Sequence, residues 1–252
     1  MILQYASDLH LEFIENKNFL SENPVEPAGD ILILAGDIVP FAVMDKHKDF
    51  FRYVSYNFEK TYWIPGNHEY YFSDVNRRSG TFKEQILPNV FLVNNITEII
   101  DGVKLVFSTL WSDIAPQYRW QVEHGMSDFN VIKNGKYKLS ADKFNALHKE
   151  CLGFISGELM KPKMEKTVVV THHVPTLKNY PEKYKSSVLN SAFAVELYDL
   201  IETSSPDYWI YGHNHFNQPD FKIGNTVLTT NQLGYVVNNE QKGYSGEKVI
   251  FM

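Results

Sequence analysis

Short apolar runs rich in Val, Ile, Tyr and Phe recur along this chain of 252 residues and constrain its fold more than any other feature. Continuous runs of this length and composition are typical of β-strands in sheets that are covered on both faces. Eight runs are predicted to be strands: Ile2 to Ala6, Asp30 to Ala35, Thr61 to Pro65, Val90 to Val93, Lys104 to Ser108, Thr167 to Val170, Tyr208 to Tyr211 and Thr226 to Thr229. The fold must therefore bury its sheets between other layers.

Helical patterns lie between several of these runs. They predict helices over Asp45 to Glu59, Ser140 to Leu159 and Asn190 to Thr203, and the side chains of Ser140 and Asn190 are suited to cap the helices that they begin. Strands that alternate with helices favour an α/β fold, here a layered α/β sandwich.

The chain shows no internal repeat and no Gly/Ser linker, which predicts a single domain over residues 1–252. The stretch from Trp111 to Leu139 is aromatic and lacks clean periodicity, so it is the best candidate for an insertion over the functional site. There it is expected to act on substrate choice more than on metal binding.

Five of the eight runs end, within one or two residues, in side chains that bind metal ions. The five pieces are Ser7-Asp8-Leu9-His10, Gly36-Asp37, Gly66-Asn67-His68-Glu69, Thr171-His172-His173 and Gly212-His213-Asn214-His215. In open α/β folds, ligands bind in the crevice outside the carboxyl ends of the strands, so these pieces are expected to converge. Carboxylate, amide oxygen and imidazole suit divalent Mn, Fe, Zn or Ni, and a single cysteine rules out a thiolate site.

Local geometry supports the same interpretation. In Asp8-x-His10 and His213-x-His215, an extended or turn backbone sends residues i and i+2 the same way, so both members of each pair can reach the site. A glycine precedes Asp37, Asn67 and His213, which lets the chain turn sharply and approach an ion without a Cβ clash.

Taken in order, the pieces are D-x-H, GD, GNH[DE], H and GHxH, and the sequence resembles the calcineurin-like metallophosphoesterase superfamily. The opening Ser7 to Phe13 and the stretch Met126 to Phe129 are similar to its small, stand-alone bacterial members. The resemblance implies a four-layer α/β/β/α sandwich with the metal site at the C-terminal ends of strands. It also implies one ion on Asp8, His10, Asp37 and His215, and a second on Asp37, Asn67, His172 and His213.

The implied activity is metal-dependent hydrolysis of a small phosphomonoester or phosphodiester. Two divalent transition-metal ions, Mn first with Fe, Zn or Ni as alternatives, would share Asp37 and a bridging hydroxide nucleophile. His68 would protonate the leaving alkoxide, oriented by Asp8 or another carboxylate of the cluster. The second piece continues as Ile38-Val39-Pro40 and not as the GDxxDRG of the family's protein phosphatases, which counts against that branch.

Three further residues are weaker candidates for substrate binding: His173, Arg119 and Arg77. His173 could instead support a metal ligand from behind. A guanidinium fork matches phosphate geometry, although surface solvation is the more common role of one arginine. His148 and Cys151 follow the helical pattern of residues 140–159 and are expected to pack in the core.

The net charge of −6 offers no broad positive field, so a small phosphorylated substrate is the expected partner and long nucleic acid is not. Two alternatives remain: a nuclease for short nucleic acids, and a metal-stabilised protein-interaction scaffold, which the complete set of ligands disfavours. The first residues do not resemble a signal peptide, and no run reaches the roughly 18 apolar residues of a membrane span. A cytoplasmic location without membrane contact is expected.

Overall fold

Two six-stranded sheets form the centre of the protein, whose computed structural model describes residues 1–162 and 166–252. The first sheet has the order β14 (Val249–Phe251), β1 (Ile2–Ala6), β2 (Ile31–Ala35), β3 (Lys60–Ile64), β5 (Val90–Asn94), β4 (Phe82–Leu87). The second has the order β12 (Phe221–Ile223), β13 (Thr226–Thr230), β11 (Tyr208–Tyr211), β10 (Lys166–Thr171), β7 (Val103–Ser108), β6 (Ile96–Ile100). A separate two-stranded ribbon joins β8 (Lys133–Asn134) to β9 (Tyr137–Lys138).

The eight predicted strands are the central strands of the two sheets, and each pairs in parallel with its central neighbours. The strands that the sequence did not reveal, β4, β6, β12 and β14, are the outer ones and pair antiparallel. They are partly exposed. An edge strand needs no continuous apolar run, so the pattern that identified the central strands is missing there.

The strands bury alternate residues in different layers. In β2, Ile31 and Ile33 enter the core between the two sheets, whereas Leu32 and Leu34 enter the core on the outer face of the first sheet. Tyr62 of the first sheet stacks on Phe107 of the second at a centroid distance of 4.9 Å, so the two sheets pack face to face. This arrangement explains why the central strands are apolar throughout.

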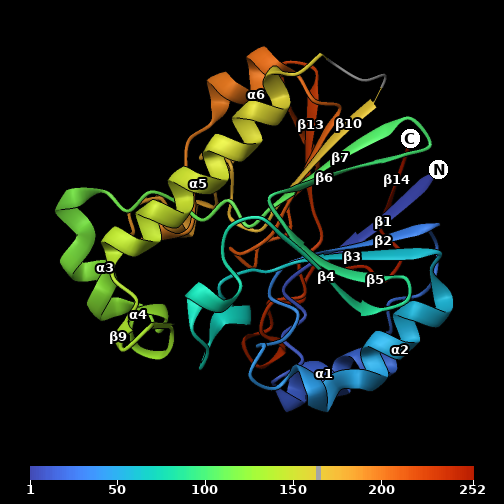
Figure 1. Cartoon of the computed structure of the whole chain (residues 1–252), viewed down its shortest axis with the longest axis horizontal. Coiled ribbons are helices and arrows are strands. Elements are labelled where there is room, and N and C mark those ends of the chain that lie inside the picture. Colours follow the sequence, from blue (N-terminus) through green and yellow to red (C-terminus); the bar gives the residue numbers. More distant parts are fainter. Residues whose placement is uncertain (163–165) are drawn as a thin grey trace.

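Helices cover both outer faces (Figure 1). On the first sheet lie α1 (Ile14–Glu22) and α2 (Lys48–Asn57), and on the second lie α5 (Ala141–Met160) and α6 (Tyr198–Ser204). Phe51 of α2 packs in the outer core of the first sheet, and Ile201 of α6 packs in that of the second. The predicted four-layer α/β/β/α sandwich is confirmed.

Two of the three predicted helices agree with the structure. The region 45–59 forms a 3₁₀ turn (Met44–His47) followed by α2, and 140–159 forms α5, where Ser140 Oγ accepts a hydrogen bond from the Lys143 N–H at 3.3 Å. In the core, Cys151 and His148 are buried as predicted.

The prediction of a helix over Asn190 to Thr203 is wrong in its first half. Only Tyr198–Ser204 is α-helical, after a short 3₁₀ turn at Asn190–Ala192. The chain between residues 193 and 197 instead pairs with the loop after β10. In this pairing the Val195 N–H donates to the carbonyl of Val174 at 3.0 Å. Tertiary hydrogen bonds override the helical period here.

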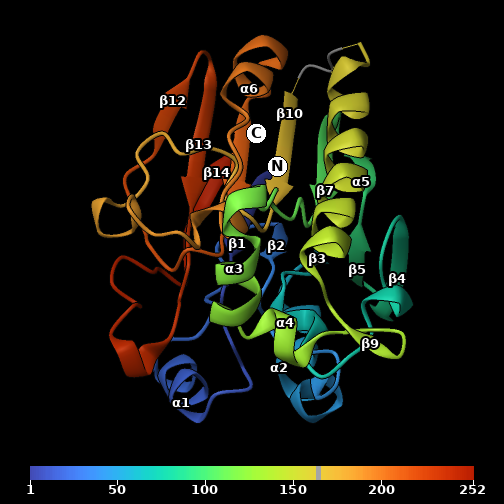
Figure 2. The same ribbon diagram turned by 90° about the vertical axis from the view of Figure 1, so that its left-hand side faces the viewer.

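The carboxyl ends of the parallel strands point toward the side that faces the viewer in Figure 2. The stretch 111–139 folds over that side and carries α3 (Arg119–Gly125) and α4 (Asp128–Val131). No helix in the described ranges has the length and apolar composition that a bilayer span requires.

Candidate metal centre

The five pieces lie together at the carboxyl ends of β1, β2 and β3 of the first sheet and β10 and β11 of the second. The side chains that they bring together are called the metal cluster below: Asp8, His10, Asp37, Asn67, His172, His213 and His215. Their possible ligand atoms form two groups that share Asp37. One is Asp8, His10, Asp37 and His215, and the other is Asp37, His172 and His213, each with its atoms within 4.8 Å of one another.

In the first group, four side chains from three loops converge on one point. His10 Nε2 lies 3.0 Å from His215 Nε2, and His215 Nε2 lies 3.3 Å from Asp8 Oδ1. Asp37 Oδ2 is 3.9 Å from His10 Nε2. Two imidazole nitrogens and two carboxylates are suitable donors for a divalent transition metal.

In the second group, His172 Nε2 is the common neighbour. It lies 3.3 Å from Asp37 Oδ2, 3.1 Å from His213 Nδ1 and 3.3 Å from Asn67 Oδ1. The carboxamide oxygen of Asn67 thus joins the two imidazoles and the shared carboxylate. This partition of ligands is the one that the family resemblance implies.

The backbone of the cluster is strained where ligands are presented. Asp8, His10, Asp37, His213 and His215 have φ values of 56°, 47°, 55°, 79° and 48°. Such left-handed conformations are uncommon for residues other than glycine, cost about 1–3 kcal/mol each and concentrate at functional sites. Five in one cluster indicate that the positions of these side chains are imposed by the surrounding structure.

Two glycines form a cradle around the second group. A Cβ at Gly66 would lie 2.2 Å from Asp37 Oδ1 and 2.6 Å from His172 Nε2, and one at Gly36 would lie 2.3 Å from His172 Nδ1. Any side chain at these positions would displace the donors, which is the close approach that the sequence predicted. The donor chemistry and this cradle both fit a bound metal ion.

The electrostatics of the cluster favour positive charge. Burial raises the pKa of Asp8 and Asp37, but the imidazoles of His215 and His172 outweigh it and hold the pKa of both carboxyls below the usual range. Burial lowers the pKa of the imidazoles, but Asp37 raises the pKa of His172 to about 9, and Asp8 with Glu240 raises that of His215 to about 10. At His172 and His215 a bound cation would replace a proton, whereas burial lowers the pKa of His10 and of His213.

Outer partners fix the imidazoles. His10 Nδ1 lies 3.2 Å from Glu12 Oε1, and His215 Nδ1 lies 2.6 Å from Glu240 Oε2. His172 Nδ1 donates to the carbonyl of Ala35 at 2.9 Å. A donated Nδ1–H leaves Nε2 free to bind a metal, and such partners orient the ring.

Glu12 also holds His68. His68 Nδ1 lies 3.1 Å from the same Oε1 of Glu12, Nε2 lies 3.0 Å from the hydroxyl of Tyr235, and the ring stacks on Tyr71 at 4.0 Å. Burial lowers the pKa of His68, but Asp37 and Glu12 raise it above the ordinary value. The carboxylate that orients His68 is therefore Glu12 and not Asp8.

The stretch 111–139 reaches the metal cluster through Asp128. Its Oδ1 accepts from Asn67 Nδ2 at 2.9 Å, and its Oδ2 accepts from the hydroxyl of Tyr71 at the same distance. The first contact turns the amide oxygen of Asn67 toward His172. This stretch therefore orients a candidate ligand, although its residue pattern predicts an effect on substrate choice more than on metal binding.

Glu69 joins the loops after β2 and β3. Its buried carboxylate accepts from the backbone N–H of Asp37 at 2.8 Å, Ile38 at 2.7 Å and Gly66 at 2.6 Å, and from Trp63 Nε1 at 3.0 Å. Burial and the Asp37 carboxylate raise the pKa of Glu69 to about 8, against these donors.

The structure does not bring His173 to the cavity beside the cluster. His173 is fully buried behind His213, with ring centroids 4.2 Å apart, and packs against Trp111 at 5.4 Å. Neither ring nitrogen has a hydrogen-bond partner among the described residues, and burial holds its pKa well below the usual value. The expected substrate contact is replaced by packing behind a ligand.

The two arginines also lie elsewhere. Arg119 Nη1 pairs with Asp142 Oδ1 of α5 at 2.6 Å, and Arg77 lines a separate surface depression with Phe72 and Asp74. Neither lines the cavity beside the metal cluster, so the expectation that they bind substrate there finds no support.

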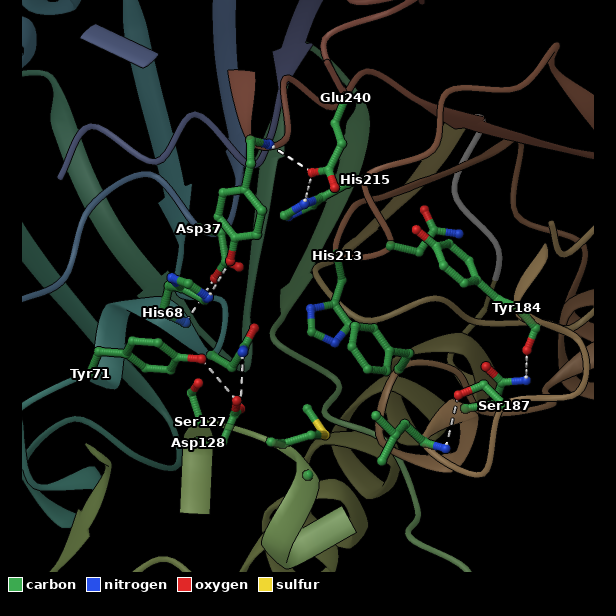
Figure 3. A pocket seen from close by; sticks show the side chains of 18 of the residues that line it. Asp37, His68, Tyr71, Ser127, Asp128, Tyr184, Ser187, His213, His215 and Glu240 are labelled. Carbon is green, nitrogen blue, oxygen red and sulfur yellow. Dashed lines mark hydrogen bonds and ion pairs between the residues drawn. The ribbon is translucent and has the colours of Figure 1, made fainter. Parts of the chain in front are cut away.

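A cavity of about 340 Å³ opens onto the cluster (Figure 3). Asp37, Asn67, His68, His213 and His215 form one side of it. Tyr235 and Glu240 adjoin them, and further lining residues come from the ranges 125–128 and 180–193. Glu12, Tyr235 and Glu240 were missed by sequence reasoning. Of these three, only Glu12 could have been found from the sequence, because it stands two residues after His10.

The fold and the site together are those of a phosphoesterase whose side chains can bind metal ions. The chain belongs to the calcineurin-like phosphoesterase family, whose model matches residues 5–217. Protein L509 of Acanthamoeba polyphaga mimivirus is 34% identical to this chain, in an alignment that covers 93% of this chain and 91% of that protein. The fold is similar to that of phosphopantetheinyl hydrolase (PptH) from Mycobacterium tuberculosis, with a TM-score of 0.71, 19% identity, and coverage of 99% of this chain and 95% of that one. Tyr235 and Glu240 lie beyond the matched residues.

Proposed function

We propose that this protein is a hydrolase of small phosphomonoesters or phosphodiesters that works with two divalent transition-metal ions, Mn²⁺ first. The observation that carries the proposal is the pair of donor groups that share Asp37. Asp8, His10, Asp37 and His215 would hold one ion, and Asp37, Asn67, His172 and His213 the other. Bound ions of this kind neutralise phosphate oxygens and lower the pKa of a water molecule from about 15.7 to about 7.

The chain's own contribution to bond cleavage is a proton at His68. Glu12 accepts the Nδ1–H of His68, so the ring keeps one orientation and presents Nε2 to the cavity. The hydroxyl of Tyr235 lies 3.0 Å from that nitrogen, and a substrate oxygen would contact Nε2 at this position. In the proposed reaction, Nε2 gives its proton to the leaving oxygen as its bond to phosphorus breaks, a role worth about 10²- to 10⁴-fold in rate.

Two observations weigh against the alternatives. A scaffold without catalysis would not need all seven candidate ligands and His68 to converge. A nuclease needs a basic path for the phosphate backbone, and among the described residues that line the cavity there is no Lys or Arg. Phosphopantetheinyl compounds belong in a substrate screen, because a protein of the same fold is a phosphopantetheinyl hydrolase.

The test is metal removal and replacement in the full chain. Protein stripped with chelator and reloaded with Mn²⁺ should bind up to two ions and regain hydrolysis of p-nitrophenyl phosphate, bis-p-nitrophenyl phosphate or a phosphopantetheinyl ester. His172→Ala should bind less metal and lose activity, whereas His124→Ala, at an exposed position, serves as the matched control. Activity that survives chelation, or Mn²⁺-loaded protein that hydrolyses none of these esters, would defeat the proposal.

A further inference from the structure

Six residues that line the cavity outside the metal cluster have their own chemistry. These residues, called the leaving-group wall below, are Met126, Tyr184, Ser187, Asn190, Phe193 and Asn214. We propose that it binds the alcohol portion of the substrate and selects phosphoesters whose leaving group is uncharged and carries an amide or hydroxyl group. The proposal rests on the proposed hydrolase function and names its substrate class.

The wall provides apolar surface that begins at the metal cluster. The ring of Phe193 stacks on His213 with centroids 4.6 Å apart, so an apolar face adjoins a candidate ligand directly. Met126 lines the same cavity. The ring of Tyr184 extends the apolar surface (Figure 3). A carbon-rich group attached to the phosphate would be desolvated against these side chains.

The wall also provides uncharged polar groups that are held in place. Asn214 Oδ1 accepts from Gln232 Nε2 at 2.9 Å, which leaves its Nδ2 as a donor. Asn190 Nδ2 donates to the carbonyl of Tyr184 at 2.5 Å, which leaves its Oδ1 as an acceptor. One fixed donor and one fixed acceptor match an amide or a hydroxyl of the leaving group.

The charge of the side chains that line the cavity distinguishes this wall from a site that binds a second phosphate. The acids that line the cavity, Asp128 and Glu240 beside Asp37, are all hydrogen-bonded, and outside the metal cluster and His68 no Lys or Arg of the described residues lines it to balance an anion. Lys183 lies nearby, with its ammonium 4.4 Å from the ring centroid of Tyr184, but it is not a lining residue. An anionic leaving group would be desolvated without a partner, which is costly.

Matched aryl compounds test this selection, because they differ in one substituent. 4-Carbamoylphenyl phosphate has a neutral amide where 4-carboxyphenyl phosphate has a carboxylate. The Mn²⁺-loaded protein should hydrolyse the amide compound with a kcat/KM at least 10-fold higher. The corresponding benzylphosphonates, which are not hydrolysed, should differ in Kd by a similar factor in calorimetry.

A cation added to the wall should remove the preference. Ser187→Lys places an ammonium at an exposed lining position and should reduce the preference at least 10-fold through a lower KM for the carboxylate compound, with metal content unchanged. Ser186→Lys, one residue away and outside the lining, should leave the preference as it is.

The outcomes separate the two proposals. Equal affinity for both phosphonates, a preference for the carboxylate, or no binding of either would overturn the inference. A carboxylate preference that Lys183→Ala abolishes would assign anion binding to Lys183 instead. Selective binding of the amide phosphonate without turnover of any ester would support the wall and defeat the hydrolase proposal.

Discussion

Glu12 is the residue whose replacement tests the site most directly, because one carboxylate oxygen serves two imidazoles. Its Oε1 lies 3.2 Å from His10 Nδ1 and 3.1 Å from His68 Nδ1. Glu12→Gln keeps the shape of the side chain but removes the charge, and its amide oxygen is a weaker acceptor for two N–H groups. We expect the variant to fold and to lose the orientation of one imidazole or both.

The magnitude follows from this double role. Loss of a partner that orients a metal-binding imidazole costs about 10- to 100-fold in metal affinity or activity, or about 1.4–2.7 kcal/mol. Through His10, the affinity for Mn²⁺ should fall by that factor. Through His68, kcat at saturating Mn²⁺ should fall by a similar factor. Burial raises the pKa of Glu12, but hydrogen bonds from both imidazoles lower it to about 2. The carboxylate is therefore ionised throughout pH 5–9, and the loss should not depend on pH there.

The assay is a Mn²⁺ titration of hydrolysis with calorimetry of Mn²⁺ binding, and Glu15→Gln, on the exposed first turn of α1, is the control. If only the Mn²⁺ affinity falls, Glu12 acts through His10 alone and the dual role is refuted. If neither the affinity nor kcat changes, both contacts are dispensable and the reasoning fails.

Four further predictions concern the same centre. Asp37→Ala should lose both ions and at least 100-fold in activity, since this carboxylate is shared by both groups; elemental analysis that finds two ions contradicts this. Asp128→Asn should weaken Mn²⁺ binding about 10-fold, and unchanged calorimetry would show that its contact with the ligand amide is dispensable. His68→Ala should keep both ions and lose about 10²- to 10⁴-fold in kcat on an alkyl ester but much less on a p-nitrophenyl ester, and equal losses argue against proton transfer. The pKa is about 9 for His172 and about 10 for His215 without metal, so Mn²⁺ loading at pH 7.5 should release about two protons from these imidazoles. The affinity for Mn²⁺ should therefore rise with pH. Calorimetry in buffers of different ionisation enthalpy measures the protons released, and no release contradicts the prediction.

The central strands and the candidate ligands could be predicted because their signals are local. A parallel strand covered on both faces is apolar throughout, and a ligand at its end is one or two residues away in sequence. The pairs Asp8 with His10 and His213 with His215 were identified by their spacing, although their backbones are left-handed and not extended. A strand that is buried on both faces, and a ligand that directly follows such a strand, can therefore be recognised in a single sequence.

The other residues of the site follow no such local sequence pattern. Glu240 reaches His215 from a loop 25 residues later, and Tyr235 reaches His68 across 167 residues. Their positions depend on tertiary hydrogen bonds, such as the one from Tyr235 N–H to Glu240 Oε2 at 2.8 Å. Arg119 was a plausible phosphate ligand by chemistry alone, but Asp142 on α5 holds it elsewhere. Residue type indicates what a side chain can bind, whereas packing decides what it meets.

The strained ligands show how the fold holds the site. Asp8 N–H donates to the carbonyl of Gly36 at 2.9 Å, His10 N–H to that of Asp37 at 3.0 Å, and His213 N–H to Asp8 Oδ1 at 3.1 Å. The loops after β1, β2 and β11 are therefore bonded to one another through the backbones that present the ligands. These bonds, and those that the carboxylate of Glu69 accepts, join protein groups to one another, so the fold itself orders the backbones that present the ligands. Metal affinity then needs to offset little loss of conformational entropy, which is the advantage of preorganisation.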